Sequence, residues 1–391
     1  MVDKDVKGDT MNFMFNLTEQ QEMLKKAARD FLAAECPKKL VKDMEADKKG
    51  YPTDLWKKMA DLGWLGLVLP VEYGGAGLDI TELVVLLEEM GRACLPSPFC
   101  STVVGGMAIS DIGSIEQKAW ILPEVSRGKI IITLALTEPA LRYNPALITT
   151  KAVRRDGNYV INGTKLSVAY SHVADLVVCA TRTSKKATKL ALTLFLVDGK
   201  SKGIDSSLMA TLPAVKNFKV DFNGVAVPKK NMLGALNRGW PELKKTRQRA
   251  TIAQCAEMLG GAQQTLEMTI DYAKQRIQFG RPIGTFQSVH NRIVDMVIGI
   301  DGARYLTHQA AVMLSRQLPC DKYVSMAKAW ISDSYKKTVL SGCIIHGGLS
   351  ATVDSDIQLY FRRAQLAGLS LGDTDFHRII IAEELTKNKM Q

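Results

Sequence analysis

The chain has 391 residues, of which 46% are apolar, and a formal net charge of +11. These values allow a large core in two or three structural regions, and they exclude a transmembrane helix because no window approaches about eighteen uninterrupted apolar residues. The lysines occur in short pairs rather than in one stripe with interleaved aromatic residues, so the sequence gives no support to nucleic-acid binding and fits a solvated surface or a phosphate-rich ligand.

The first region, residues 16–132, is predicted to be helical. Thr18-x-x-Gln21 is a capping box, which marks the start of a helix. Two further helical patterns cover Leu55–Leu62 and Leu83–Met90. The first helix is expected to bury apolar positions at helical spacing, namely Leu24, Ala27, Phe31 and Ala34.

Residues 133–238 change character and are predicted to form an antiparallel β-sandwich. Asp156-Gly157 and Asn162-Gly163 are both typical of hairpin turns. Short runs rich in β-forming residues are bounded by Gly, Asn, Lys or Pro: Leu176–Cys179, Leu190–Val197 and Phe218–Val227.

Helical periodicity returns over residues 239–391, for which we predict a four-helix bundle with helices near 285–316, 320–345 and 374–388. The order of helices, strands and helices indicates an α+β multidomain protein and excludes a doubly wound sheet, in which strands alternate with helices. No complete dinucleotide fingerprint or P-loop is present, so a nucleotide would be held in another way. The long helix that opens the region is marked by an apolar face, Leu259, Ala262, Leu266, Ile270 and Ala273.

Seven cysteines and five histidines are dispersed along the chain. The cysteines are odd in number and none is spaced as CxxC, which indicates reduced thiols in a cytoplasmic protein. The same dispersal argues against a metal site, and we predict none. Residues 1–15 mix acids, lysines and a glycine without an apolar centre, so we interpret them as a flexible leader rather than a secretory signal.

Five stretches carry recognisable motifs in the same order along nearly the whole chain. They are Pro70–Leu78, Leu136–Pro139, Asn162–Lys165, Tyr272–Gln287 and His346–Gly348. Together they resemble the signature segments of the acyl-CoA dehydrogenase family. The resemblance implies that family's fold, FAD as the cofactor and α,β-desaturation of an acyl-CoA thioester. A base would remove the α-proton, hydride would pass to the flavin, and electron-transferring flavoprotein would receive the electrons.

The resemblance also assigns residues to the cofactor. Arg276 and Phe279 resemble residues that hold the FAD of a neighbouring subunit, and Gln287 resembles one at the adenosine portion. Because this loop crosses a subunit interface in the family, we predict a tetramer, either homomeric or α2β2 with a homologous subunit. An ordinary surface or core role is the alternative for each residue.

Three more residues resemble contacts to the cofactor. Gly347 and Gly348 resemble a pair whose backbone approaches FAD, where only the absence of a Cβ gives room. Thr137 resembles a threonine beside the flavin ring. A helix-ending pair of glycines is the alternative for the first two.

The glutamate that acts as base in the family has no counterpart here. Its usual position holds Leu371, and the position that some members use on the long helix holds Ala250. A third position, used by members that act on ring substrates, falls in a segment without acids. The remaining carboxylates that could serve as a relocated base are Asp373, Asp375 and Glu257.

The flavin face departs from the family as well. Ser167–Ala169 replaces Trp-Ile-Thr, and Arg142–Asn144 replaces Gly-Ser-Asp. These departures, with Gly91–Thr102 and the Arg-Arg-Ala segment at Arg362–Ala364, resemble a branch that supplies one subunit of α2β2 pimeloyl-CoA and steroid side-chain dehydrogenases. Three readings stay open: a subunit paired with a catalytic homologue, a self-sufficient enzyme with a relocated base, and a flavin-poor binding or structural subunit.

Overall fold

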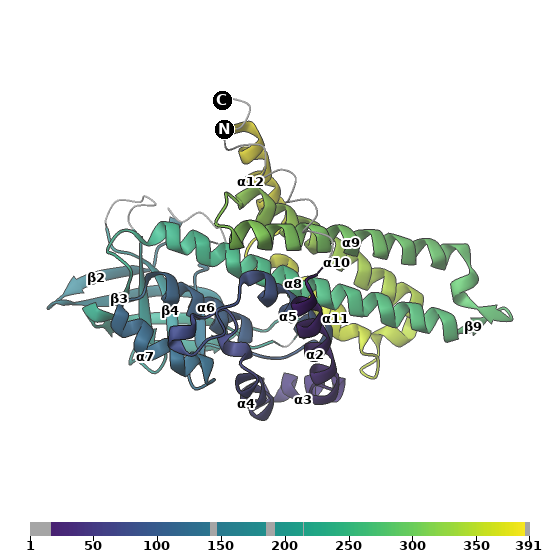
Figure 1. Ribbon diagram of the computed structural model, residues 1–391, viewed down its shortest axis with the longest axis horizontal. Helices are drawn as coiled ribbons and strands as arrows, with labels where there is room; N and C mark the ends of the chain where they lie inside the picture. The colour runs from purple at the N-terminus through teal and green to yellow at the C-terminus, as the bar shows by residue number, and fades with distance from the viewer. Residues whose placement is uncertain (1–16, 141–146, 185–191, 214, 388–391) are drawn as a thin grey trace. The chain divides into compact units, whose positions relative to one another are not determined.

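The computed structural model describes residues 17–140, 147–184, 192–213 and 215–387 (Figure 1). Two compact units form. The first contains the chain up to Val41, Ile80–Leu95 and the residues from Thr251 onwards, and the second contains Lys42–Asp79 and Pro96–Ala250. Helices come first along the chain, a β-sheet region lies in the middle, and helices return at the end, which confirms the predicted fold class.

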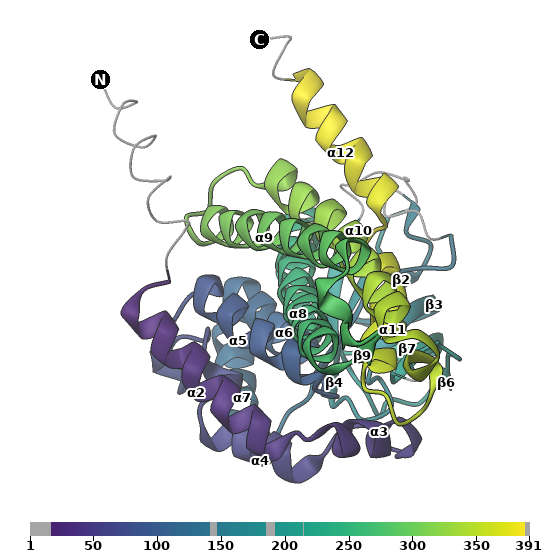
Figure 2. The ribbon, with the colours of Figure 1, turned by 90° about the vertical axis from the view of Figure 1, so that its right-hand side faces the viewer.

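The first unit is helical. In it, α10 packs against α9, α11 and α12, while α5 packs against α2 and α9, and Figure 2 shows α9 and α10 side by side. Helix α11 was not predicted from the sequence, and no side chain caps its start. The helices are α2 (Glu19–Glu35), α5 (Ile80–Ala93), α9 (Gln287–Ser315), α10 (Asp321–His346), α11 (Ile357–Leu369) and α12 (Thr374–Lys387), while α3 (Lys38–Ala46) and α8 (Gly239–Gln275) have residues in both units.

Helix α2 begins as predicted, but the residues that it buries differ from those predicted. The Thr18 side chain accepts a hydrogen bond from the Gln21 amide and the Gln21 side chain accepts one from the Thr18 amide, which confirms the capping box. The buried positions are Ala28 and Leu32, not the predicted Ala27 and Ala34, which are exposed. On the same helix, Arg29 forms an ion pair with the buried Glu89 of α5, against which α2 packs.

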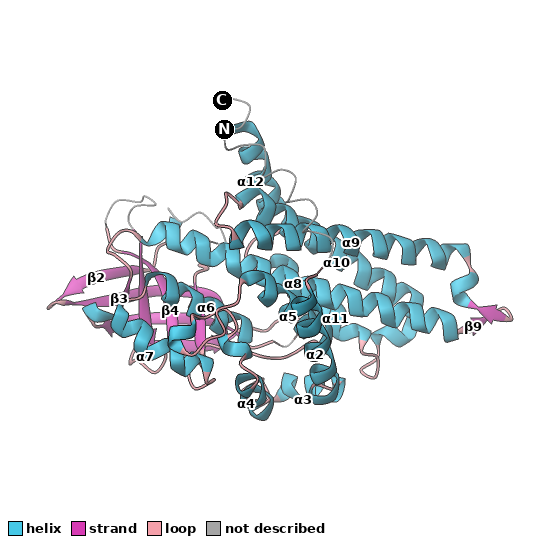
Figure 3. Ribbon diagram, in the orientation of Figure 1, coloured by secondary structure: helices cyan, strands magenta, loops and turns pink. Residues whose placement is uncertain are grey.

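The second unit holds one eight-stranded sheet with the order β6-β7-β3-β2-β4-β5-β8, in which β1 pairs with β4. Most pairs are antiparallel, but β1 and β2 run parallel to β4, so the sheet is mixed rather than purely antiparallel. Figure 3 shows strands of this sheet in magenta. Its strands are β1 (Ile132–Ala135), β2 (Lys151–Arg155), β3 (Asn158–Ala169), β4 (Leu176–Arg182), β5 (Leu192–Asp198), β6 (Ile204–Leu208), β7 (Asn217–Val227) and β8 (Met232–Leu233).

One of the two predicted hairpin turns is confirmed. Asp156 and Gly157 join β2 to β3 with φ angles of 47° and 80°, as a two-residue hairpin requires. Asn162 and Gly163 instead lie inside β3, at a shift in its register with β7, so the prediction of a turn there was wrong. A Cβ at Gly163 would lie 2.6 Å from the Cα of Thr150, so this glycine allows a close approach of two backbones.

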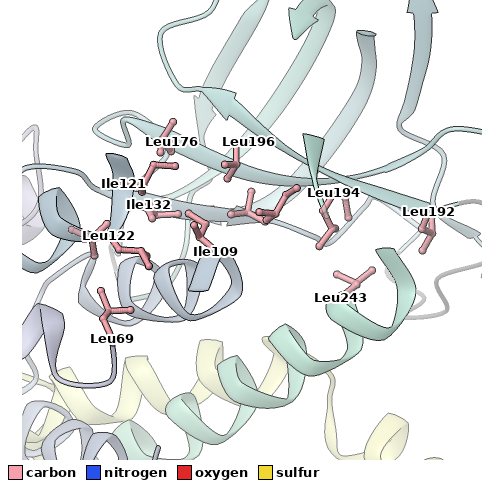
Figure 4. Close-up of a cluster of buried hydrophobic side chains, with 14 of the residues drawn as sticks. Leu69, Ile109, Ile121, Leu122, Ile132, Leu176, Leu192, Leu194, Leu196 and Leu243 are labelled. Carbon is pink, nitrogen blue, oxygen red and sulfur yellow. The ribbon is translucent and has the colours of Figure 1, made fainter. Parts of the chain in front are cut away.

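Both faces of β4 and β5 are buried, because their side chains alternate between two apolar clusters. Val178 and Leu194 point to a cluster shared with helices and with Leu243 of α8 (Figure 4). Cys179 and Phe195 point to a second cluster, which is closed by β3 and β7. Each buried side chain of this size stabilises the fold by roughly 1.5–3 kcal/mol. The unit's own helices are α4 (Thr53–Asp61), α6 (Phe99–Ile112) and α7 (Ile115–Ser126).

All seven cysteines are free thiols. Within the part of the chain that the structure describes, no group of three or more His, Cys, Asp or Glu side chains could hold a metal ion. None of the helices described is long and apolar enough to cross a membrane.

Candidate functional site

A two-stranded hairpin follows α8 and leads to α9 (Figure 1). Its strands, β9 (Ile277–Gln278) and β10 (Arg281–Pro282), are joined by Phe279 and Gly280, whose φ angles are 53° and 77°. A positive φ is unfavourable for a residue with a Cβ, and the Phe279 side chain is also 92% exposed. Its ring meets that of Phe286 edge-on, with centroids 6.1 Å apart, and this contact leaves most of the side chain exposed. Packing within this chain therefore gives little reason for a phenylalanine in the turn.

The predicted FAD contacts Arg276 and Gln287 flank this hairpin. The Arg276 amide donates to the Tyr272 carbonyl at the end of α8, and the Arg276 carbonyl accepts from the Ile283 amide. The side chains of Arg276 and Gln287 are exposed, and Arg276 has no ion pair among the residues described. The structure thus places Arg276 and Phe279 on one exposed loop, and Gln287 at the start of α9, which follows it.

The end of α10 meets the end of α8 beside this loop. The ring of His346 stacks on that of Tyr272, with centroids 4.2 Å apart. Gly347 follows with φ 63° and ψ −145°, a conformation that favours glycine. A Cβ built on Gly347 or Gly348 would meet no atom of the chain within 4 Å. Two motifs that lie far apart in the sequence are therefore neighbours, and the Gly348 backbone is open to a ligand.

His346 adds an unusual polar atom at this point. Its Nε2 is buried and has no hydrogen-bond partner among the described residues. Burial also lowers the pKa of the imidazole, which favours the neutral form of the ring. The sequence analysis treated this histidine only as part of a motif.

Thr137 belongs to the other unit, where it is half-buried and its carbonyl accepts from the Leu166 amide at 2.9 Å. The neighbouring Glu138 carboxylate accepts four hydrogen bonds: from the Lys165 Nζ at 2.8 Å, from the Thr149 amide and hydroxyl at 2.6 Å each, and from the Thr150 amide at 3.0 Å. Two motifs noted separately in the sequence therefore form one buried ion pair, which holds the backbone beside Thr137.

The predicted flavin-face residues can be placed only in part. Ser167 is exposed, with φ 53°, and lies at a register shift between β3 and β7. Val168 beside it is fully buried in the second apolar cluster. Arg142–Asn144 lie outside the described residues. Ser167 therefore presents a small hydroxyl at an irregular point of the strand.

Leu371 lies in a tight turn between α11 and α12. Its φ is 60° and that of Gly372 is 116°, and a Cβ on Gly372 would lie 2.5 Å from the Phe376 ring. The Leu371 carbonyl is 3.3 Å from the His377 Nε2, whose Nδ1 is 3.2 Å from the Ser325 hydroxyl of α10. The turn is thus fixed in place, but its half-buried leucine cannot take up a proton.

A lysine that the sequence analysis missed supports the same turn. Lys328 of α10 is fully buried, and its Nζ donates to the Ala367 carbonyl near the end of α11. An ammonium at the C-terminus of a helix is favourable because the helix dipole is negative there. Burial lowers the pKa of Lys328 to about 8. Its position between the buried Val324 and Ile331 on α10 was the available signal.

Two of the three alternative bases have other roles. Asp373 is exposed, and its carboxylate accepts from the Phe376 amide at 2.8 Å, so it caps the start of α12. Asp375 is exposed and pairs with Arg378 at 3.4 Å. Neither geometry suits a base that must approach a carbon atom in a dry site.

Glu257, on α8, differs from both. It is half-buried and its carboxylate makes no hydrogen bond within the described residues. Burial raises its pKa to about 7, while the positive charge of Arg363 opposes the rise. A carboxylate with such a pKa is poised to exchange a proton near neutral pH, which is typical of functional sites. Ala250, on the same helix, is buried and offers no such group.

Replacing Glu257 by glutamine is expected to stabilise the protein at pH 8 by up to about 3 kcal/mol, and much less at pH 5. The carboxyl has a pKa of about 7 when folded against a usual value of 4.5. The wild type therefore loses stability as the pH rises from 4.5 through about 7, whereas the variant has no carboxyl here and does not. Urea unfolding at both pH values measures this, and an equal difference at both would contradict it.

Comparison with known proteins agrees with the fold. The family models for the N-terminal, middle and C-terminal domains of acyl-CoA dehydrogenase match residues 18–129, 133–222 and 237–386. An acyl-CoA dehydrogenase of Bacillus subtilis is 30% identical, over 95% of this chain and 99% of its own.

Two further relatives extend the comparison. A 3-(aryl)acrylate reductase of Clostridium sporogenes is 32% identical, again over 95% of this chain and 99% of its own. The ChsE4–ChsE5 complex from Mycobacterium tuberculosis contains a chain that is 26% identical, with a TM-score of 0.88 and coverage of 95% and 98%. Such dehydrogenases and reductases are oxidoreductases that act on CH–CH bonds, and the family's members are flavoproteins. This chain belongs to the acyl-CoA dehydrogenase family.

Proposed function

We propose that this chain is an FAD-binding subunit that takes part in α,β-desaturation of an acyl-CoA thioester, together with a homologous chain that supplies the base. The observation that carries the proposal is the exposed, strained Phe279 beside the exposed Arg276, in a chain whose usual base positions hold Leu371 and Ala250. Phe279 and Arg276 support retention of the cofactor. Leu371 and Ala250, which cannot take up a proton, support dependence on a partner chain for the base.

The residues at the hairpin and at the end of α10 fit FAD. The guanidinium of Arg276 offers a fork of donors that suits a diphosphate, and the open backbone at Gly348 allows a ligand to approach closely. Phe279 on this hairpin and Gln287 at the start of α9 would cover the adenosine portion. When bound, FAD would supply the acceptor for the hydride of the β-carbon.

The same loop supports a proposed assembly. An exposed hairpin that carries both a charged and an aromatic contact serves best if it reaches the cofactor of a neighbour, as it does in the family. The chain would therefore work as a tetramer, homomeric or α2β2, with electron-transferring flavoprotein as acceptor and in the cytoplasm. A monomer by light scattering that holds a full complement of FAD would contradict this assembly.

The substitution Arg276→Ala is expected to weaken FAD retention by about tenfold or more without unfolding the chain, because a charge-assisted contact is lost from an exposed position. Arg276→Lys should recover only part of the affinity, since an ammonium does not match two oxygens at once. The ratio of flavin to protein absorbance after dialysis measures retention. Circular dichroism provides the check on folding, and unchanged retention in Arg276→Ala would remove this residue from the site.

The experiment that tests the proposal is purification of the chain alone and together with the product of a neighbouring homologous gene. Yellow material that desaturates acyl-CoA only in the joint preparation is the expected result. Full activity of the isolated chain on straight-chain acyl-CoAs would overturn the paired version. Because one relative is a reductase, the assay should run in both directions.

Two observations favour other readings. The raised pKa of Glu257 supports a self-sufficient enzyme with a relocated base acting on an unusual acyl group, in which Glu257→Gln would abolish turnover by the isolated chain. The exposed Ser167 supports a flavin-poor binding or structural subunit, which would be colourless when purified. Colour and isolated turnover together separate all three readings.

A further inference from the structure

Two side chains one turn apart on α8 carry acceptor oxygens for which the described residues provide no hydrogen-bond donor. The Oε1 atom of Gln254 is buried and accepts no hydrogen bond from any described residue. Glu257 follows three residues later, and its half-buried carboxylate also makes none within that part of the chain. Residues three apart are neighbours on a helix surface. An unsatisfied buried acceptor is unfavourable, so the Gln254 oxygen, with the half-buried Glu257 carboxylate one turn away, indicates a bound group that donates hydrogen bonds to both.

The backbone at Glu257 is held tightly in place. A Cβ on Gly91 of α5 would lie 2.0 Å from the Glu257 carbonyl oxygen, so α5 and α8 are in backbone contact at this point. Gly260, one turn further, has the same relation to the Glu88 carbonyl at 1.8 Å. The start of the Glu257 side chain is therefore rigidly positioned, as a specificity site requires.

The positive charge near Glu257 limits which chemical groups a ligand can place beside its carboxylate. Arg363 of α11 acts on the carboxylate electrostatically, and it also donates to the Leu95 carbonyl at 3.4 Å. Its positive charge disfavours a second cation at the same place. Both Gln254 and Glu257 present acceptor oxygens, so the group that satisfies them is a neutral donor, of which a hydroxyl is the simplest.

We infer that Gln254 and Glu257 bind a hydroxyl group on the acyl part of the substrate. The inference rests on the proposed function, because it takes the position of Ala250 on α8 as lying beside the reacting carbon. Gln254 and Glu257 follow Ala250 by four and seven residues on the same helix face. They lie about 6 Å and about 11 Å further along the helix axis than Ala250. The hydroxyl of the substrate would therefore lie about 6–11 Å from the thioester.

The test compares binding of hexanoyl-, octanoyl- and decanoyl-CoA with that of their ω-hydroxy counterparts. The FAD-loaded protein is used as purified, with its partner chain if one is present, and affinities are measured by titration calorimetry. In at least one pair the ω-hydroxy thioester should bind about three- to tenfold more tightly. The substitutions Gln254→Met and Glu257→Met should remove this preference, and Glu257→Gln should keep part of it.

Gln264→Met is the matched control, because Gln264 is also half-buried on α8 but lies ten residues beyond Gln254. It should leave the preference unchanged. Equal affinity for both thioesters of every pair in the wild type would overturn the inference, as would a preference that persists in both methionine variants. If the protein binds no acyl-CoA of either kind, the proposed function fails, and the inference fails with it.

Discussion

The substitution Leu371→Glu is expected to raise the desaturation rate of the isolated, FAD-loaded chain by about a hundredfold or more. The position resembles that of the family's base, and the residue there now is a half-buried leucine. A carboxylate held next to an acidified α-carbon, away from water, would supply the proton transfer that the proposed function leaves to a partner chain. The gain would show that the substrate-side geometry is intact and that only the base is missing.

The turn can accept the change. Leu371 already has a φ of 60°, so glutamate brings no strain that leucine does not already have. The turn is held from α10 through the Lys328 contact to Ala367 and through His377, and neither contact uses the Leu371 side chain. We therefore expect the variant to fold and to place its carboxylate reproducibly.

Leu371→Gln is the matched control, because glutamine has the size of glutamate without its basicity. It should leave the rate at the wild-type level. Ala250→Glu tests the other position, but Ala250 is 5% exposed, so a larger side chain there will destabilise the helix packing. Equal rates in Leu371→Glu and Leu371→Gln, with FAD retained, would show that position 371 does not face the reacting carbon.

The features of the fold that could be predicted from the sequence are those that depend on residues close together in the chain. The capping box at Thr18 and the Asp156-Gly157 turn depend on residues at most three apart, and both are present. The same local pattern at Asn162-Gly163 misled the prediction, because there a glycine serves the close approach of Thr150. Whether a glycine turns a chain or lets two backbones meet depends on a partner that the local sequence does not show.

The candidate site shows the same limit more strongly. The assignments of Arg276 and Gly348 to a cofactor came from motif resemblance, and they remain predictions. The buried state of Lys328 and the isolation of Glu257 depend on helices packed against them from elsewhere in the chain. From sequence alone, a lysine or glutamate in a helix is expected to be an exposed surface residue, because most are. Only the packing of other helices shows that it is buried.

Lys165→Met is expected to lower the free energy of unfolding by about 3–5 kcal/mol, because it leaves the carboxylate of Glu138 buried without its counter-charge. The Lys165 side chain is 0% exposed and that of Glu138 is 7% exposed, and their ion pair is 2.8 Å long. Such a loss is a large part of the total stability of a typical domain.

A double substitution separates this ion pair from general packing. Glu138→Gln with Lys165→Met removes both charges, so it should be more stable than Lys165→Met alone, and urea unfolding of the three proteins measures the difference. If the double variant is no more stable than Lys165→Met, the loss arises from packing rather than from an uncompensated charge.

The pH dependence gives a second check on the same pair. Burial alone would raise the pKa of Glu138, but the charge and hydrogen bond of Lys165, with bonds from Thr149, lower it to about 2 from a usual 4.5. The stability that this carboxylate contributes is therefore fully present above pH 4.5, and it is lost as the pH falls through about 2. Lys165→Met should lose most of this dependence. Because Glu138 holds the backbone next to Thr137, the same variant should weaken flavin retention under conditions in which the chain is still folded.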